Sequence, residues 1–368
     1  MRILALEPYY GGSHKAFLDG WISSSRHQWT LLTLPPHKWK WRMRHSAATF
    51  ARQVTELVTA GEQFDMVFCT DMLPLAEFKG LVDARVANLP SVMYFHENQL
   101  TYPVQVEKER DLHFGITNFI SMQAADQVWF NSSFHRDSFF KELKITLKRM
   151  PEDKMLGEIA KTQAKSLIFP QAITENKTKR SKYLPPVHIG AVARWEFDKN
   201  PELFFSVLQK LKSKNIEFKL SFIGEQFTNS PKVFEEAKSI FKDEIVYFGY
   251  IESFAQYQKA LIEIDILIST ADHEFFGISV MEAIDAGVYP LLPNRLSYPE
   301  LLKLQDNQEN SKFFYDGSEK DLEKKLISII NQFNNGTVSY DLQNIANQYY
   351  WSNIGVMLDD SLEKLHKN

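Results

Sequence analysis

The chain has 368 residues, of which 44% are hydrophobic and 24% charged; this composition indicates a globular protein, typically of two domains, and excludes a disordered one. The formal net charge of −4 excludes a global positive field for nucleic acid or anionic membranes, so any polyanion site must be a local patch. The single cysteine, Cys69, excludes an internal disulfide, and we find neither a signal peptide nor the ~20 apolar residues of a membrane span, so we expect a cytoplasmic protein.

The first part of the chain alternates short apolar runs with amphipathic stretches, which is typical of a parallel sheet covered by helices. Predicted strands cover residues 2–6, 30–34, 66–69, 91–95 and 127–130, and predicted helices cover 46–60 and 111–124. The alternation breaks between about 145 and 186, where the chain becomes polar and basic and ends in prolines. We interpret the later part of this region as an interdomain linker.

The same alternation restarts at residue 187 and continues toward the C-terminus. Predicted strands cover 187–194, 218–224, 245–249 and 265–270; predicted helices begin near 200, cover 231–241 and 253–263, and follow beyond about 318. We therefore predict an α/β protein with two Rossmann-like parallel-sheet domains that face a central cleft. The predicted domains are residues 1–180 and 187–368, with the final helix free to pack back on the first domain.

The first candidate motif is EPYYGGSHK at residues 7–15, a turn between a predicted strand and a helix. Ligands of open α/β sheets bind beyond the carboxyl ends of strands, where this and the later motifs fall. Gly11 and Gly12 allow close backbone approach to a phosphate or sugar, although glycine is also common in turns for conformational reasons alone. Ser13 either caps the next helix or, with His14, faces an acceptor.

An unusual basic and aromatic run, LPPHKWKWRMRHSA, covers residues 34–47. Cationic side chains alternate in it with indoles: Lys38, Trp39, Lys40, Trp41, Arg42 and, after one methionine, Arg44. Cations for phosphates and indoles for base stacking suit a nucleic-acid strand. The same composition suits a bilayer interface, and a solvated loop with inward-facing tryptophans is the third possibility.

A polar cluster ends the predicted strand in YFHENQLTYPV at residues 94–104. His96 stands where a base or hydrogen-bond donor can reach a reacting centre. A single histidine is more often structural, but Glu97 and Asn98 beside it favour a functional role on the acceptor side.

Two segments of the second half place charges and a glycine at strand ends. In ARWEFDKNPELF, Arg194 ends a strand and Lys199 precedes a helix that starts near Pro201. Two fixed cations there can neutralise a departing pyrophosphate, with charge-assisted hydrogen bonds of ~1.5–3 kcal/mol each. In IGEQF, Gly224 and Glu225 follow another strand and lie either against a nucleotide or in a plain turn.

The most informative segment is HEFFGISVMEA at residues 273–283, which follows a strand and opens a helix. Glu274 can meet sugar hydroxyls, and Glu282, two turns into the helix, can meet ribose hydroxyls. Gly277 permits close backbone approach, and free N–H groups at the helix start bind anions. The backbone of the segment that surrounds the helix start is included in the predicted donor site: Phe275, Phe276 and Ile278.

Several common ligand motifs are missing from the sequence. It contains no D-x-D pair, no cluster of histidine or cysteine ligands, no Walker loop and no G-x-G-x-x-G. Charge neutralisation would then rest on Arg194, Lys199 and helix dipoles, so we predict no metal and no cofactor.

The blocks YYGGSHK, LPPHKWKWR, YFHENQLTYPV, ARWEFDKNPE, GEQFTNSP and STADHEFFGISVMEA together resemble the signature blocks of the tRNA-queuosine α-mannosyltransferases. That family is related to the GT-B, retaining, family-4-like glycosyltransferases. The blocks extend from residue 3 to about 300. The glutamate pair and the arginine–lysine pair are generic to the larger class, whereas FHENQLTYP and KWKWR are narrower and carry the specific assignment.

This resemblance implies a GT-B fold with the donor in the C-terminal domain. It implies transfer of mannose from GDP-mannose to the cyclopentene-diol of queuosine in an aspartate tRNA anticodon loop, with retained configuration and no essential metal. By position, the donor contacts would be Arg194, Lys199, Glu274 and Glu282, and His96 would lie near the transferred sugar.

Three alternatives remain open from the residues alone. The chain could glycosylate a lipid or another small acceptor with the same donor site, with residues 37–45 on a membrane. It could be a catalytically silent RNA-binding protein on the same scaffold, although intact Arg194, Lys199 and Glu274 argue against that. It could also be a sugar-nucleotide epimerase or a phosphorylase.

Overall fold

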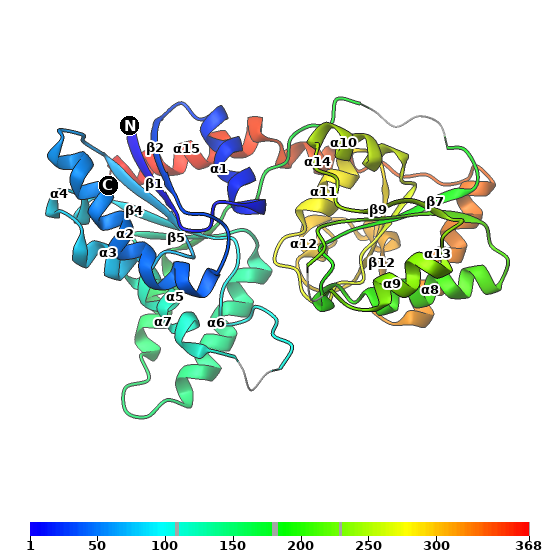
Figure 1. The fold of residues 1–368 in the computed structure, drawn as a ribbon, viewed down its shortest axis with the longest axis horizontal. Coiled ribbons are helices and arrows are strands. Elements are labelled where there is room, and N and C mark those ends of the chain that lie inside the picture. Colours follow the sequence, from blue (N-terminus) through cyan, green and yellow to red (C-terminus); the bar gives the residue numbers. More distant parts are fainter. Residues whose placement is uncertain (107–109, 179–182, 228–229, 368) are drawn as a thin grey trace. The chain divides into compact units, whose positions relative to one another are not determined.

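The computed structural model describes residues 1–106, 110–178, 183–227 and 230–367. The chain forms two compact units (Figure 1): unit 1 comprises residues 1–172 together with 351–368, and unit 2 comprises residues 173–350. Residues 179–182, within the predicted linker, and residues 228–229, within the block GEQFTNSP, lie outside the described residues.

Unit 1 contains a sheet of six parallel strands in the order β2-β1-β3-β4-β5-β6. The strands are β1 (Arg2–Glu7), β2 (Gln28–Thr33), β3 (Met66–Thr70), β4 (Ser91–Phe95), β5 (Gln127–Phe130) and β6 (Ser166–Ile168). The first five confirm the prediction from apolar runs. β6 lies in the region where the alternation breaks. It was not predicted, because it has only three residues, of which only Ser166 is buried.

Helices cover both faces of this sheet. They are α1 (Gly12–Ser24), α2 (Trp39–Thr59), α3 (Leu75–Leu81), α4 (Ala84–Ala87), α5 (Leu112–Ala124), α6 (Ser133–Lys148), α7 (Leu156–Ala164) and α15 (Trp351–Lys367). Alternate strand residues point to opposite faces. The face with Leu6 and Phe95 packs against α2, α3, α5 and α6, and the face with Phe68 and Tyr94 packs against α1 and α15.

The C-terminal helix α15 belongs to unit 1 and lies beside α1 (Figure 1). A Cβ atom on Gly20 would lie 2.2 Å from the Trp351 ring, so the glycine makes room for this packing. The buried carboxylate of Asp359 accepts a hydrogen bond of 2.8 Å from Trp21 Nε1. The helix is therefore anchored to α1 by both packing and a buried polar bond.

Helix α2 begins at Trp39, seven residues before the predicted start at 46. From Trp39 onward the basic and aromatic run is therefore the start of a helix, and the alternative of a solvated loop was wrong for these residues. Met43 and Ala47 lie four residues apart and are buried on the same face of α2. The interleaved cations hide this helical periodicity in the sequence.

Unit 2 contains a second sheet of six parallel strands in the order β12-β11-β10-β7-β8-β9. The strands are β7 (Val187–Val192), β8 (Phe218–Ile223), β9 (Ile245–Gly249), β10 (Ile266–Ile268), β11 (Tyr289–Pro293) and β12 (Phe314–Tyr315). The first four confirm the prediction. β11 contains two prolines, which disfavour strands, and β12 has only two residues. The prediction of two parallel-sheet α/β domains is confirmed.

The helices of unit 2 enclose a single core. The α-helices are α8 (Pro201–Ser213), α9 (Val233–Ile240), α10 (Phe254–Glu263), α11 (Ile278–Asp285), α12 (Tyr298–Leu301), α13 (Glu319–Asn334) and α14 (Gln343–Ala346), and the 3-10 helices are η2 (Phe197–Lys199), η3 (Gln308–Phe313) and η4 (Asn347–Tyr349). Within the described ranges of the chain, no helix is both long enough and apolar enough to cross a lipid bilayer.

Candidate active site

In unit 2, two of the predicted donor residues meet beyond the carboxyl ends of β7 and β10, which are neighbours in the sheet. The Nζ atom of Lys199 lies 3.5 Å from Glu274 Oε2 and 3.1 Å from Asp198 Oδ2. It also donates a hydrogen bond of 2.7 Å to the backbone oxygen of His273. The fold thus joins residues that are 75 positions apart in the sequence.

The electrostatics of this group keep Lys199 charged. Its side chain is only 10% exposed, and burial by itself lowers the pKa of its ammonium group. The carboxylates of Glu274 and Asp198 outweigh that effect, so the pKa is raised from its ordinary value. A fixed, nearly buried cation therefore stands beside a carboxylate that is 27% exposed.

Arg194 is the more accessible of the two predicted cations. Its side chain is 43% exposed, and its Nη2 atom pairs with Glu196 Oε2 at 3.0 Å. The positive charge of Arg194 lowers the pKa of Lys199, which shows that the two cations act on the same region. Both follow β7, as predicted.

The start of α11 shows why its glycine is required. Gly277 has φ +105°, a conformation that favours glycine. A Cβ atom there would lie 3.1 Å from the Tyr298 ring and 3.2 Å from Leu301. Phe275 and Phe276 are buried. Internal packing thus explains Gly277 without a ligand, while Ile278 opens a helix that no side chain caps.

The second predicted carboxylate, Glu282, lies in α11 and is bonded to α10. The hydroxyl group of Tyr257 donates a 2.7 Å hydrogen bond to Glu282 Oε2. Burial raises the pKa of Glu282 to about 7, although the Tyr257 bond lowers it. This carboxyl group therefore changes charge near neutral pH.

The turn after β8 is explained by backbone packing. A Cβ atom on Gly224 would lie 1.8 Å from the backbone oxygen of Ala193, so any side chain would collide with the segment that follows β7. The backbone oxygen of Glu225 accepts a hydrogen bond of 2.9 Å from Trp195. Of the two alternatives left open for this turn, the structure supports a structural role for Gly224.

In unit 1, a buried polar cluster stands at the corresponding edge of the sheet. Glu7, Asp71 and His96 end or directly follow β1, β3 and β4, which are neighbours, and His14 joins them from α1. The carboxylate of Glu7 lies 3.2 Å from His14 Nδ1, and the rings of His14 and His96 stack with centroids 4.1 Å apart. All four residues are at most 5% exposed.

The glycine turn next to this cluster is partly structural. A Cβ atom on Gly11 would lie 2.5 Å from the Pro36 ring, whereas Gly12, at φ +50°, faces open space. Ser13 is exposed inside the first turn of α1, and Gly11 occupies the N-cap position without a side-chain bond. The alternative that Ser13 caps this helix was therefore wrong.

The polar residues after His96 hold a turn. The Oδ1 atom of Asn98 accepts hydrogen bonds from the backbone N–H groups of Leu100 and Thr101, at 3.0 and 2.8 Å. Asn98 is fully buried, so its side chain serves the loop. Glu97 is half-buried and accepts a hydrogen bond of 2.9 Å from Gln99 Nε2.

The basic and aromatic run divides into buried and exposed residues along α2. Arg42 is 9% exposed, and its Nε atom donates a 3.0 Å hydrogen bond to the backbone oxygen of Pro35. Its role is therefore structural. Trp39 packs edge-on against Phe114, 5.0 Å between ring centroids. The remaining four side chains are exposed, and we call them the basic turn: Lys38, Lys40, Trp41 and Arg44.

Packing contacts within unit 1 connect the basic turn to the polar cluster. Tyr9 and Trp39 pack against the same small cluster of apolar side chains. The Tyr9 ring lies 5.9 Å from the His14 ring, which in turn stacks on His96. The guanidinium of Arg44 lies 4.9 Å over the Phe114 ring, which restrains it. A molecule on the basic turn would thus lie near the polar edge of the sheet.

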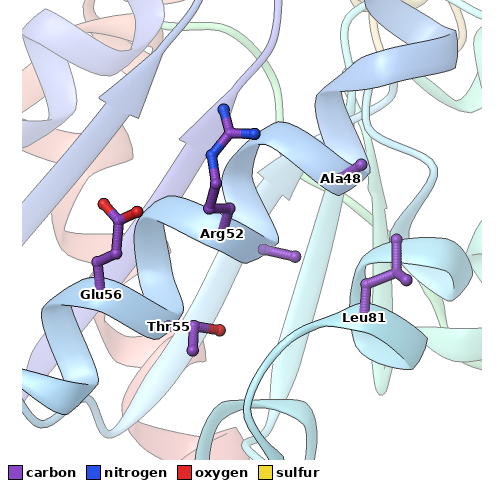
Figure 2. Close-up of a pocket in the computed structure, with 6 residues that line it drawn as sticks. Ala48, Arg52, Thr55, Glu56 and Leu81 are labelled. Atoms are coloured by element: carbon purple, nitrogen blue, oxygen red, sulfur yellow. The ribbon is translucent and has the colours of Figure 1, made fainter.

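A separate open hollow of about 320 Å³ lies farther along α2 (Figure 2). It lies between α2 and the end of α3 and is lined by Ala48, Ala51, Arg52, Thr55, Glu56 and Leu81. None of the predicted site residues lines it. Arg52 is an exposed cation on the same helix as the basic turn, eight residues beyond Arg44.

Two residues of the polar cluster, Glu7 and Asp71, and its neighbour Gln171 were not predicted from the sequence. Glu7 and Asp71 carry a signal, because each is a carboxylate at the end of a buried strand, Asp71 directly after the run MVFCT. Gln171 hydrogen-bonds to His96 but carries no signal, because it lies in the region where the alternation of elements breaks.

Sequence comparison assigns each unit to a described family. The family model "tRNA-queuosine alpha-mannosyltransferase N-terminal" matches residues 2–173. The model "Glycosyl transferases group 1" matches residues 172–335. A Drosophila melanogaster protein named tRNA-queuosine alpha-mannosyltransferase is 37% identical over 312 residues, which cover 82% of this chain and 81% of the relative.

Solved structures of other proteins have the same fold. HepE from Anabaena, in complex with UDP, superposes with a TM-score of 0.69 at 15% identity and covers 99% of this chain and 100% of its own. Sucrose-phosphate synthase from Thermosynechococcus elongatus superposes with a TM-score of 0.72 at 11% identity, with 99% of both chains covered. At these identities the likeness establishes the two-sheet fold alone.

Proposed function

Because this chain belongs to the tRNA-queuosine alpha-mannosyltransferase family, we propose that it transfers mannose from GDP-mannose to queuosine in the anticodon loop of an aspartate tRNA. It is a glycosyltransferase with a GT-B fold, and membership of the family supports mannosyl transfer to queuosine in tRNA. The GDP moiety of the donor and the aspartate tRNA rest on the resemblance of the sequence blocks.

The observation that carries the proposal is the meeting of Lys199 and Glu274 at the carboxyl edge of the unit 2 sheet, with Arg194 nearby. In sugar transfer the bond between the anomeric carbon and the phosphate oxygen breaks, and negative charge develops on the departing diphosphate. Lys199 and Arg194 stabilise that charge as it forms. Glu274 accepts hydrogen bonds from mannose hydroxyls, and Glu282 accepts them from the ribose.

The acceptor hydroxyl of queuosine then bonds to the anomeric carbon with retained configuration, and its proton leaves with the departing diphosphate. Two fixed cations supply the charge that a divalent ion would otherwise supply, so we propose a metal-independent transfer. The expected result is that turnover persists in excess EDTA.

On the acceptor side, we propose that the basic turn binds the RNA. Lys38, Lys40 and Arg44 can neutralise phosphates, while Trp41, 61% exposed, offers an indole face to an unstacked base. The anticodon loop is single-stranded, which suits this mode of binding. A tRNA substrate and a single buried thiol also support a cytoplasmic location.

A lipid acceptor is the second candidate, because exposed Trp41 between cations also suits a membrane surface. The two acceptors predict different partners. Flotation with anionic liposomes should leave the protein unbound, whereas tRNA should bind with an affinity that falls steeply with salt.

The direct experiment incubates the purified protein with GDP-mannose and with tRNA that contains or lacks queuosine, followed by mass analysis of the nucleosides. We expect a gain of one hexose on queuosine only, and none with a UDP-sugar donor. A gain on neither tRNA, with protein that still binds GDP, would remove the RNA acceptor and keep the donor assignment.

A further inference from the structure

Backbone hydrogen bonds and ring contacts hold His96 in place. Its backbone N–H donates a 2.9 Å hydrogen bond to Asp71 Oδ1, and its backbone oxygen accepts one of 3.0 Å from Asn131 Nδ2. Its ring stacks on His14 and meets Phe17 and Tyr94 edge-on, at centroid distances of 5.2 and 4.7 Å. The remaining question is the position of the ring proton.

One contact answers this question. The Nε2 atom of Gln171 lies 3.0 Å from Nδ1 of His96. With the amide nitrogen of Gln171 facing the ring, Nδ1 is the acceptor and carries no proton, because an amide nitrogen only donates hydrogen bonds. The proton of a neutral imidazole then resides on Nε2, which is buried and has no hydrogen-bond partner in the described part of the chain.

Charges around the ring favour the neutral form. Burial lowers the pKa of His96 well below its ordinary value, and the charges of His14 and His135 lower it further. Burial also lowers the pKa of His14, but the Glu7 carboxylate reverses this and raises it to about 9, helped by Asp71 and Glu97. Near neutral pH, a cationic His14 therefore stacks on a neutral His96.

We propose that Gln171 is a positioning residue that fixes His96 as a neutral imidazole with its proton on Nε2, so that His96 meets a substrate hydroxyl as a hydrogen-bond donor and not as a base. The identity of that hydroxyl rests on the proposed function. The protonation state does not, because it follows from contacts within unit 1.

The same residues could be considered as metal ligands, because ligand atoms of Glu7, His14 and His96 lie within 4.8 Å of one another. The geometry favours the hydrogen-bonded network. The two imidazoles stack with planes 30° apart, so their in-plane lone pairs lie side by side and do not converge on one ion. The Nδ1 atom of His96 is also already occupied by Gln171.

The first experiment measures the tautomer directly in the free protein. Nitrogen-15 NMR of labelled histidine distinguishes a protonated from an unprotonated ring nitrogen, and the variant His96→Asn assigns the signals. We expect Nε2 protonated and Nδ1 unprotonated from pH 6 to 8, with no change on addition of zinc. A proton on Nδ1, a cationic His96 at pH 7, or zinc-shifted His96 signals would overturn the inference.

The second experiment changes Gln171. In Gln171→Glu, the introduced carboxylate would accept a hydrogen bond from an Nδ1–H group, so the proton of the neutral ring would reside on Nδ1 and not on Nε2. At pH 6, either the ring is an imidazolium or the introduced carboxylate is protonated, and both states keep a proton on Nε2. We therefore expect kcat to approach the wild-type value at pH 6 and to fall about 10- to 100-fold toward pH 8.5. Gln171→Met should lower kcat at all pH values.

The matched control is Gln63→Glu, which adds the same charge at an exposed glutamine of unit 1. It should keep the wild-type pH profile. A flat profile in Gln171→Glu would contradict the positioning role. If the wild type shows the expected tautomer but transfers no mannose to queuosine tRNA, the proposed function fails and the protonation state stands.

Discussion

The polar groups at the edges of the two sheets are built in opposite ways. In unit 2, Lys199 is held between two carboxylates and Arg194 is 43% exposed, so the group consists of full charges that a ligand can reach. In unit 1, Glu7, His14 and His96 are almost fully buried and joined by short-range contacts. The group in unit 2 is therefore suited to a charged ligand, whereas the contacts in unit 1 hold one ring in place.

The largest expected effect comes from Lys199→Met, which removes the cation between Asp198 and Glu274. It leaves buried Asp198 without its ion-pair partner, and breaking a buried pair costs about 3 kcal/mol or more. We expect the free energy of unfolding to fall by that amount and turnover to be lost. Denaturant unfolding checks the first effect. Adding Asp198→Asn should restore part of the stability but not turnover, and full stability in the single variant would contradict the ion-pair assignment.

Next in size is Arg194→Ala, which should lower kcat/KM about 100- to 1000-fold because a charge-assisted contact to the leaving group is lost. The side chain is half-exposed, so the unfolding midpoint should change little. Arg149→Ala, at an exposed arginine in unit 1, is the matched control. Near-normal turnover in Arg194→Ala would remove this residue from the donor site.

A smaller effect is expected for Glu7→Gln in unit 1. Because the folded-state pKa of His14 is raised to about 9, the Glu7–His14 pair contributes stability that is fully present below the ordinary histidine pKa and is lost as pH rises through 9. We expect the variant to be less stable than the wild type by about 2–3 kcal/mol at pH 6, with the difference vanishing near pH 9.5. Thermal melts across this range check it, and a pH-independent difference would contradict a charged pair.

The smallest effect, with the opposite sign, is expected for Glu282→Gln in unit 2. The folded-state pKa of Glu282 is raised to about 7, so the wild type loses stability as pH rises from about 4.5 through 7. The variant should be more stable at pH 8 by roughly 1–2 kcal/mol, since the side chain is only partly buried, and similar at pH 5. Its affinity for GDP at pH 8 should fall. Equal stability at both pH values would argue that Glu282 stays ionised.

Much of this arrangement could be predicted from the sequence, because parallel strands place their carboxyl ends on one edge. Lys199 and Glu274 each follow a predicted strand, so their proximity needs only that β7 and β10 be neighbours. The start of α2 was missed, because cations between Trp39 and Met43 obscure a helical face that only tertiary packing completes.

Other features depend on contacts that local patterns do not encode. Gly224 is a glycine because another backbone segment approaches it, and Asn98 is occupied by its own turn. Gln171 lies 75 residues from its partner His96, in a segment with little periodicity. Residue types at strand ends thus indicate a site, while the division of those residues into ligand contacts and structural supports requires the structure.

The measurement that tests the contrast most directly is the equilibrium affinity for GDP and for queuosine tRNA in two variants, one for each unit. For Arg194→Ala, we expect weaker GDP binding and unchanged tRNA binding. For the double variant Lys40→Ala and Arg44→Ala, we expect unchanged GDP binding, tRNA affinity about 10-fold lower and a shallower salt dependence, with Arg52→Ala close to wild type. The reverse pattern, or equal loss of both ligands in both variants, would contradict a donor site in unit 2 and an RNA site in unit 1.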